Sequence, residues 1–413
     1  MQLQLTDGTT TVTLSGTSPV TGCTYFPETP ERKGGVYSDV TETAQVVLAG
    51  TAANIRTTIN NIERLLELAA LRQAGGTNPK VYVNYAPVSE TAHRSEVLEG
   101  RVVWDPNPGL RRLGDTAPTA RVGVIWRRRY YWEGAETSLG AATTINNGPT
   151  GNTLTYNSVT GSLPTPVRLT LSNPGSSIAT RRFYVANDST GMFATTDQFL
   201  YVAGGSESVT WVGSASHANP LWTIDVPTAL AAAMRGERYR VWAAFSSIPD
   251  NVYVRASVQS VISTVYQMGQ AGGELLAGGD NGKQLMDLGA LNMPPAGYIG
   301  SGTVFSIVLS LYAVSGGSAT LLWVMLAPAH ATLNLRQIGY NLGTSQAVVH
   351  DGIEGVDYLS LASKYPAVER SGELLLYPGQ SNKLRLLWDE GNTFSASRQL
   401  SVTGVYRPRR ILV

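Results

Sequence analysis

The side chains that most often carry out catalysis or bind metals are few and scattered in this chain. There is one cysteine, Cys23, and no pair of histidines has the spacing of a zinc-binding motif. The four histidines are His93, His217, His330 and His350. His350 and Asp351 are adjacent, so their side chains point to opposite faces of an extended strand. With Gly352 they are interpreted as a surface turn, and we expect no metal ion, no cofactor and no catalytic residue.

Two further patterns resemble catalytic motifs only superficially. The segment 278–283, Gly-Gly-Asp-Asn-Gly-Lys, resembles a phosphate-binding loop, but that motif needs glycine where Ala277 stands and serine or threonine where Gln284 stands. Glu133 lies beside Trp132 and could act as a glycosidase acid, which would require a second carboxylate that the sequence cannot place. A surface or interface carboxylate paired with an arginine is the favoured interpretation of Glu133. The chain is therefore not expected to be an enzyme.

A run of cations is interleaved with aromatic residues at positions 126–132. Such a mixture can contact nucleic acid, but residues 1–136 carry fourteen basic and fourteen acidic side chains, which argues against nucleic-acid recognition. The alternatives are a strand with arginines outward and aromatics inward, or a subunit interface, where arginine is enriched. The candidate interface residues are Arg127, Arg128, Arg129 and Tyr131, together with Tyr25 and Phe26 from an earlier loop.

Aromatic residues recur in the strands expected later in the chain. They are Trp211, Trp222, Trp242, Tyr253 and Trp388. Aromatic faces can form a sugar-stacking platform, as in carbohydrate-binding jelly rolls, although aromatics in strands more often fill a core. Trp211, Trp222 and Tyr253 are the candidate contacts to a glycan or a partner.

Composition predicts a large, mainly β protein. The 413 residues suggest two or three domains, and 43 glycines with 21 prolines favour many short strands joined by tight turns. Charged residues make up only 15%, and 31 basic against 30 acidic residues give a net charge of +1. Such a balance produces no general attraction to nucleic acid or to an anionic membrane.

The first domain is expected over residues 1–136, as a β-sandwich with one amphipathic helix at about 52–74. Apolar residues in this helix fall on one stripe, and the stripe consists of Ile55, Ile59, Ile62, Leu66 and Ala69. Thr51 is a plausible N-cap, and Gly75 and Gly76 indicate the end. Residues 16–40, rich in glycine and proline, are expected to be a long loop, which is usually functional or an interaction arm.

The second domain is expected over residues 161–413, as a large antiparallel jelly roll or β-sandwich, after a linker or domain-entry loop at 137–160. Whether it is one jelly roll or two packed sandwiches stays open. Residues 288–335 lack charged side chains, but glycines and prolines divide the apolar run. The segments 304–314 and 319–327 are therefore expected to form a buried hairpin, and no membrane insertion is expected.

The order of these parts resembles the distal tail proteins of long-tailed bacteriophages. The stretch Thr41–Gly50, leading into the helix segment 54–66, carries most of the resemblance. Four later pieces are similar to the galectin-like or carbohydrate-binding-module-like jelly rolls of such proteins. They are residues 161–167, 287–295, 377–380 and 406–409.

The resemblance implies a hexameric ring that joins the tail tube to the tip or baseplate. The partners would be further copies of the chain, the tail tube protein and tail-tip or hub proteins. The protein would be located in the virion after assembly in the host bacterial cytoplasm, and its second domain would project outward and contribute to host adsorption through a surface glycan. A polysaccharide-binding host-recognition protein without ring assembly is the main alternative, and a glycan-cleaving enzyme on a β scaffold is a third.

Overall fold

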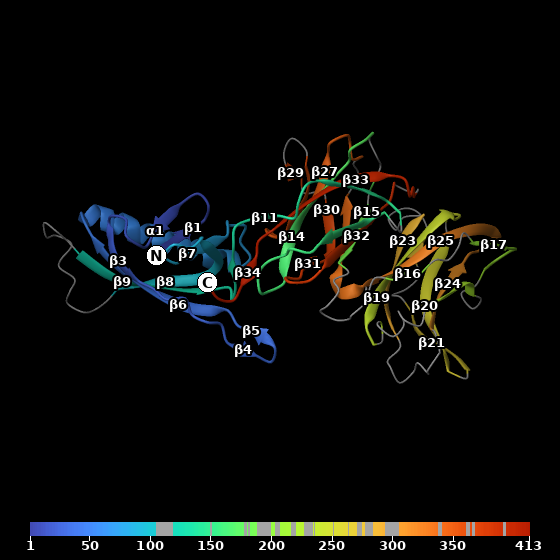
Figure 1. Cartoon of the computed structure of the whole chain (residues 1–413), viewed down its shortest axis with the longest axis horizontal. Helices are drawn as coiled ribbons and strands as arrows, with labels where there is room; N and C mark the ends of the chain where they lie inside the picture. The colour runs from blue at the N-terminus through green and yellow to red at the C-terminus, as the bar shows by residue number, and fades with distance from the viewer. Residues whose placement is uncertain are drawn as a thin grey trace. The chain divides into compact units, whose positions relative to one another are not determined.

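The computed structural model describes most of the chain, which divides into two compact units (Figure 1). The described residues are 1–104, 119–148, 151–176, 180, 182–187, 200–202, 207–215, 220–226, 234, 236–250, 252–262, 264–270, 275–276, 284–293, 305–337, 341–360, 364–365, 368–390 and 394–413. Unit 1 comprises Met1–Thr137, Thr160–Leu163 and Arg407–Val413, and unit 2 comprises Ser138–Val159 and Pro164–Tyr406. The end of the chain thus belongs to unit 1, because its last strand pairs there.

Unit 1 is built on one nine-stranded antiparallel sheet, in which seven strands follow the order β2-β1-β7-β8-β9-β6-β3 and β10 pairs with β8 and β34. The strands are β1 (Gln2–Thr6), β2 (Thr11–Thr13), β3 (Val20–Thr24), β6 (Val40–Ala49), β7 (Val81–Ala86), β8 (His93–Trp104), β9 (Thr119–Arg128), β10 (Trp132–Glu133) and β34 (Arg409–Arg410). In β6, even-numbered residues from 40 to 48 are buried and most odd-numbered ones are exposed. This alternation leaves one face of the strand in the core.

The predicted helix is confirmed as α1 (Ala52–Gln73). The Thr51 hydroxyl caps its start by accepting a hydrogen bond from the Asn54 backbone N–H at 3.2 Å. Its predicted stripe is buried, together with Leu65, in one cluster with side chains of the sheet. The helix ends before Gly75, whose φ of +97° suits a residue without a side chain. No described helix is both long and apolar enough to cross a membrane.

Close contact between α1 and β8 depends on Gly100. A Cβ atom at this position would lie 2.6 Å from the Ile125 carbonyl oxygen and 2.7 Å from Leu66 Cδ2. We expect Gly100→Ala to destabilise unit 1 by about 1–3 kcal/mol, because the helix or the strand must shift. The matched control is Gly123→Ala on β9, where the nearest atom to the added Cβ is 3.6 Å away. Urea unfolding of both variants checks this, and equal midpoints would contradict it.

Between β3 and β6 the chain forms an arm, which we define as residues 26–39. The sequence predicted a loop over 16–40, and the structure adds three short strands to that region. β3 pairs with β6 inside the sheet, whereas β4 (Arg32–Lys33) and β5 (Val36–Tyr37) pair only with each other. Figure 1 shows this two-stranded hairpin extending beyond the end of β6.

Unit 2 contains two β-sandwiches, and the first, the carrier sandwich, consists of an eight-stranded and a five-stranded sheet around one core. Its larger sheet holds β11 (Thr137–Ser138), β12 (Thr143–Asn146), β14 (Thr165–Ser172), β27 (Ala347–Asp351), β28 (Val356–Ser360), β29 (Lys364–Tyr365), β31 (Leu375–Leu376) and β33 (Gln399–Tyr406). Its smaller sheet holds β13 (Thr153–Tyr156), β15 (Arg182–Asn187), β26 (Thr332–Gln337), β30 (Val368–Gly372) and β32 (Asn382–Trp388).

The segment 137–160, expected to be a linker or a domain-entry loop, contains the strands β12 and β13. β12 pairs with β33 and β13 pairs with β32, so this segment adds strands to both sheets of the carrier sandwich. Only Ile145 and Leu154 in these two strands are buried. One apolar residue per short strand is enough to anchor it, which explains why the composition resembles a linker.

The second sandwich, the inserted sandwich, lies in the chain between β15 and β26, which are hydrogen-bonded neighbours in the carrier sandwich. One sheet holds β16 (Leu200–Val202), β17 (Glu207–Trp211), β19 (Arg238–Ser247), β23 (Leu285–Asn292) and β25 (Gly317–Pro328). The other holds β18 (Pro220–Asp225), β20 (Tyr253–Ile262), β21 (Thr264–Gln270), β22 (Leu275–Leu276) and β24 (Phe305–Tyr312). A short 3-10 helix, η3 (Ala329–Ala331), follows β25.

The apolar segments expected to form a hairpin are β24 and β25, and that prediction is wrong. The two strands belong to different sheets of the inserted sandwich. Leu309 and Leu311 of β24 share one core with Leu321 and Leu326 of β25. The glycine-rich connection thus passes from one sheet to the other, and the two strands contribute to the core from opposite sides.

Candidate functional site

A buried carboxylate, Glu42, organises the end of the unit 1 sheet beside the arm. It accepts hydrogen bonds from the Tyr25 hydroxyl at 2.7 Å, the Trp126 indole N–H at 3.2 Å and Arg128 Nη2 at 2.6 Å. The Glu28 backbone N–H donates a fourth bond at 2.9 Å. Glu42 and Arg128 are fully buried as side chains. Because the buried charge is both paired and hydrogen-bonded, its desolvation is compensated.

The same network fixes the start of the arm. Besides its bond to Glu42, the Arg128 guanidinium donates to the Glu28 carbonyl oxygen at 3.2 Å, and it lies 4.2 Å from the centre of the Trp132 ring. Glu28 is thus held through both its backbone N–H and its backbone C=O. The geometry ties the first residues of the arm to strands β6 and β9, which are distant in sequence.

Beyond this anchor the arm presents apolar side chains to solvent. Phe26 is 79% exposed, although the preceding Tyr25 is buried against Trp126 and Tyr85. Val36, in the hairpin, is 71% exposed. They are single exposed side chains, as Val88 and Val212 are elsewhere in the chain, and they are the apolar groups that the arm offers to a partner.

The structure divides the predicted arginine and tyrosine candidates into two groups. Arg128 and Tyr25 are buried, so they support the arm from inside unit 1. Phe26, Arg127, Arg129 and Tyr131 keep part of their surface exposed. The interpretation that arginines in this strand point outward is therefore wrong for Arg128, because the strand period of two places it on the same face as Trp126. Their role at a subunit interface remains a prediction.

The exposed candidates pair with carboxylates close by. Arg127 Nε lies 3.0 Å from Glu99, and Arg129 lies 3.5 Å from both Asp39 and Glu96. The Arg127–Glu99 pair is exposed to solvent, where ion pairs contribute little to stability, whereas the partners of Arg129 are more buried. The Arg127–Glu99 pair is therefore the one most easily exchanged for a contact with a partner.

Glu133, interpreted from the sequence as a surface or interface carboxylate paired with an arginine, is buried in unit 1. It is 6% exposed and accepts hydrogen bonds from Arg94 Nε and from Arg409, each at 3.2 Å. The predicted arginine pairing is thus found, but the carboxylate is buried where β10 meets β8 and β34. Glu133 fastens the C-terminal segment to unit 1.

Tyr131 gives unit 1 a predicted sensitivity to alkali. Burial raises the pKa of its phenol to about 12 from an ordinary value of 10.0, and the Glu133 and Glu96 carboxylates act in the same direction against Arg409. The folded state therefore keeps a proton that the unfolded chain loses, so this stabilisation is complete below about pH 10 and disappears as the pH rises toward 12. The free energy of unfolding, measured with urea at about pH 9 and about pH 11, should decrease less between these two pH values for Tyr131→Phe than for wild type. Equal losses would contradict the prediction.

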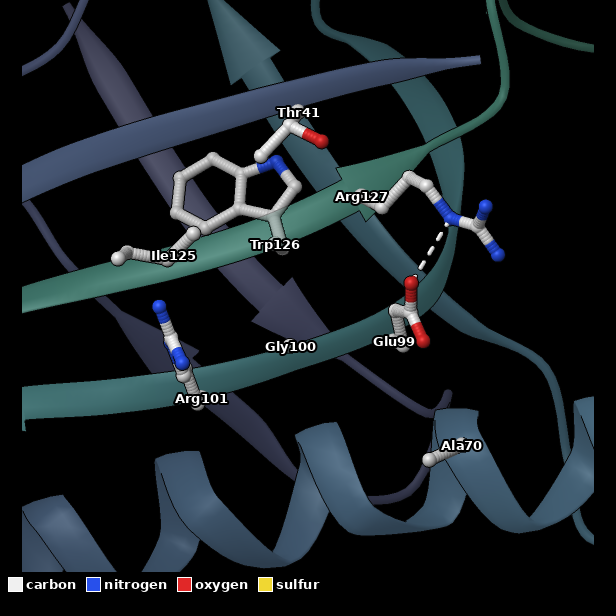
Figure 2. A pocket seen from close by; sticks show the side chains of 8 residues that line it. All are labelled: Thr41, Ala70, Glu99, Gly100, Arg101, Ile125, Trp126 and Arg127. Carbon is white, nitrogen blue, oxygen red and sulfur yellow. Dashed lines mark ion pairs between the residues drawn. The ribbon is translucent and has the colours of Figure 1, made fainter.

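A hollow of about 410 Å³ opens beside the same strands (Figure 2). Its lining residues are Thr41, Ala70, Glu99, Gly100, Arg101, Ile125, Trp126 and Arg127. Figure 2 shows Ala70 on α1 and the Arg127–Glu99 ion pair between β9 and β8. We call this hollow the Gly100 pocket. No sequence pattern pointed to it, because it combines residues from β6, β8, β9 and α1.

Of the three predicted glycan or partner contacts, two are core residues. Trp222 is 1% exposed and donates to the Glu207 carbonyl oxygen at 3.2 Å, and Trp211 donates to the Ser315 carbonyl oxygen at 2.9 Å. Their indoles pack in the core of the inserted sandwich, so they present no stacking face. Tyr253 is 36% exposed, and its ring centre lies 6.0 Å from that of the exposed Tyr312. The sequence did not point to Tyr312, which is the cross-strand partner of Tyr253.

His350 and Asp351 do not form the expected surface turn. Both are buried at the end of β27, which lies between β14 and β28. Their side chains point to opposite faces as predicted, since His350 Nδ1 lies 2.6 Å from Asp357 and Arg168 Nε lies 2.7 Å from Asp351. Each therefore pairs with a different neighbour inside the carrier sandwich.

No three His, Cys, Asp or Glu side chains lie together as metal ligands in the part of the chain that the structure describes. Cys23 is half-buried, and burial raises the pKa of its thiol to about 11, which disfavours the nucleophilic thiolate. The rejected phosphate-loop segment 278–283 and His217 lie outside the described residues.

Comparison with known proteins gives little information. No model of a protein family matches the chain, and no curated protein sequence matches it. Among solved structures, the chain is similar to one described as "Crystal structure of infectious bursal disease virus VP2 subviral particle". The similarity covers 67% of this chain and 80% of that chain, at 8% sequence identity and a TM-score of 0.19. At that TM-score the likeness carries no information about fold or function.

Proposed function

We propose that this chain is a structural protein of a bacteriophage tail, and that its copies form a ring through unit 1. The ring would join the tail tube to the tip or baseplate, and unit 2 would project outward and contribute to host adsorption. One observation carries the proposal: a preformed arm exposes Phe26 and Val36 from a base fixed by the buried Glu42–Arg128 pair. The resemblance of residues 41–66 to distal tail proteins points in the same direction.

An arm of this kind suits a ring for a physical reason. A ring needs a head-to-tail contact, in which one patch of a subunit meets a different patch of the next. An arm that is already ordered at its base loses less conformational freedom on binding than a disordered segment would. The near-neutral chain also brings little electrostatic repulsion between copies, at a net charge of +1.

Labelling of intact phage tails with antibodies against this chain tests the proposed location. We expect the label at a single level, where the tail tube meets the tip. The proposal would be contradicted if the label were found along the whole tube or on the capsid, or if the particle carried no label.

A polysaccharide-binding protein without ring assembly is the second candidate, and the Tyr253–Tyr312 pair favours it. The two rings are exposed side by side on adjacent strands of the inserted sandwich, 6.0 Å apart and 60° from parallel. Tyrosine combines an apolar face with a hydroxyl that can donate a hydrogen bond, as sugar binding requires. Binding to a glycan array that is lost in Tyr253→Ala and Tyr312→Ala, by a chain that stays monomeric, would establish this function instead.

A further inference from the structure

The end of the chain, residues 407–413, is fastened to unit 1 on two sides, and we call it the C-terminal strap. On one side its strand β34 pairs with β10. On the other side the backbone N–H groups of Ser162 and Leu163 donate to the Arg409 carbonyl oxygen at 2.8 Å and 3.2 Å. Because these backbone bonds are few, the side chains around the strap contribute to how firmly it is held.

His93 lies at the start of β8, beside the strand that holds the strap. The next residue, Arg94, is the cross-strand partner of Glu133 in β10. Trp132, one residue before Glu133, pairs with Arg410 of the strap. Because successive side chains alternate between the two faces of a strand, His93 lies on the face opposite to Arg94. Trp132 and Arg410 lie on the same face as His93.

The surroundings of the His93 imidazole favour its neutral form. The residue is 5% exposed, and its Nδ1 atom has no hydrogen-bond partner among the described residues. The charged groups that act on it are Arg410 of the strap and Glu90 in the loop before β8, and both are exposed. Since solvent screens exposed charges, burial of the imidazole is the larger effect. A proton on His93 would therefore create a buried cation next to the strap.

The opposite face of these strands provides no spare negative charge. There Glu133 already accepts hydrogen bonds from Arg94 and Arg409, each at 3.2 Å. Arg407 lies 3.7 Å from Glu136, and burial together with the charge of Arg94 lowers the pKa of its guanidinium. The strap is thus held where positive charge already exceeds negative charge, so a further cation is unfavourable.

We propose that His93 is an acid-sensitive switch for the C-terminal strap, and that protonation of its imidazole loosens residues 407–413 from unit 1. Release of the strap takes Arg410 away and admits water to the imidazole. The inference does not depend on the proposed ring, because it concerns contacts within one chain.

The direction of the pH dependence follows from the same surroundings. Burial lowers the pKa of the His93 imidazole below its ordinary value of 6.5, and Arg410 acts in the same direction against Glu90 and the Thr91 backbone. The chain with the strap in place therefore binds this proton less tightly than the chain with the strap released. The strap should be held fully above about pH 7.5 and should loosen as the pH falls below 6.5.

Hydrogen exchange of the full-length chain, followed by mass spectrometry, tests the switch. The amides of Gly134, Ser162 and Leu163 report on the strap, because their acceptors are the Pro408 and Arg409 carbonyl oxygens. Their protection is measured against the intrinsic exchange rate at each pH. Between about pH 7.5 and about pH 5.5 we expect protection to fall several-fold, toward the roughly tenfold limit for one histidine at one unit below its ordinary pKa. Glutamates, with an ordinary pKa of about 4.3, keep their charge at both pH values.

Three substitutions assign the effect. His93→Phe keeps a buried aromatic ring that cannot be protonated, so protection should be the same at both pH values. Arg410→Met leaves the imidazole in place and removes the neighbouring cation, so the loss of protection should be smaller than in wild type. The control His330→Phe removes an exposed histidine of unit 2 and should lose protection as wild type does.

The proposal is overturned if wild-type protection is equal at the two pH values. It is also overturned if His93→Phe loses as much protection as wild type, since another group would then carry the effect. Should His93→Phe fail to fold, an undiminished loss in Arg410→Met decides against the switch in the same way.

Discussion

Arg128→Met is expected to destabilise unit 1 by about 3–5 kcal/mol, because it leaves the buried Glu42 carboxylate without its counter-charge. The substitution also removes the guanidinium contact with Trp132 and the hydrogen bond to the Glu28 carbonyl. The base of the arm should therefore loosen as the sheet weakens. Urea unfolding followed by tryptophan fluorescence measures the change, since Trp126 and Trp132 adjoin the network.

Two controls separate the buried pair from a general effect of losing an arginine. Arg127→Met removes the neighbouring guanidinium, which is 46% exposed, and should cost less than about 1 kcal/mol. Adding Glu42→Gln to Arg128→Met removes the unpaired charge, so the double variant should be more stable than the sum of the single effects predicts. An Arg128→Met chain as stable as Arg127→Met would show that the pair is not essential to the fold.

Phe26→Asp is expected to abolish assembly while leaving unit 1 folded. Burying a phenylalanine contributes about 1.5–3 kcal/mol, which corresponds to a roughly 10- to 150-fold change in affinity at each contact between copies. Every contact in a ring is the same, so the loss recurs at each of them. Sedimentation velocity over a dilution series should show oligomers for wild type and monomers for Phe26→Asp at the same concentrations.

The matched control for this substitution is Val88→Asp. Val88 is exposed in unit 1 as Phe26 is, but it lies in the turn between β7 and β8 and is not part of the arm. It should assemble as wild type does. Equal behaviour of the two variants, whether both assemble or both fail, would remove Phe26 from the interface.

The amphipathic helix was predictable because its signal is local. The residues of its stripe recur at helical spacing within one segment, and Thr51 and Gly75 mark its ends in the sequence. The mainly β class was predictable for a similar reason, since alternating segments and turn residues recur along the whole chain. Such patterns need no knowledge of which segments meet.

The buried network could be predicted only in part. Side chains alternate between the two faces of a strand, so an inward-facing Trp126 already places Arg128 inward. The prediction that the arginines of this run point outward did not take this into account. Its partner Glu42 lies 86 residues earlier, and the pairing of β6 with β9 brings the two together. Because single sequences do not reveal strand partners, the carboxylate could not be identified as part of a site.

The topology of unit 2 could not be predicted for the same reason, because a single sequence does not show which strands pair. The segments β24 and β25 read as a hairpin because apolar strands flank a glycine-rich turn, yet each finds its partners in a different sheet. The insertion of one sandwich between β15 and β26 was not recognisable from the amino-acid composition either. Tyr312 was missed for this reason, since only its pairing with Tyr253 distinguishes it from other strand tyrosines.

Negative-stain imaging of the purified wild-type chain tests the proposed assembly most directly. We predict closed rings of six copies, with unit 1 around the centre and a particle mass of about six times the 44.1 kDa chain. Single chains at all concentrations, or open filaments in place of rings, would contradict it.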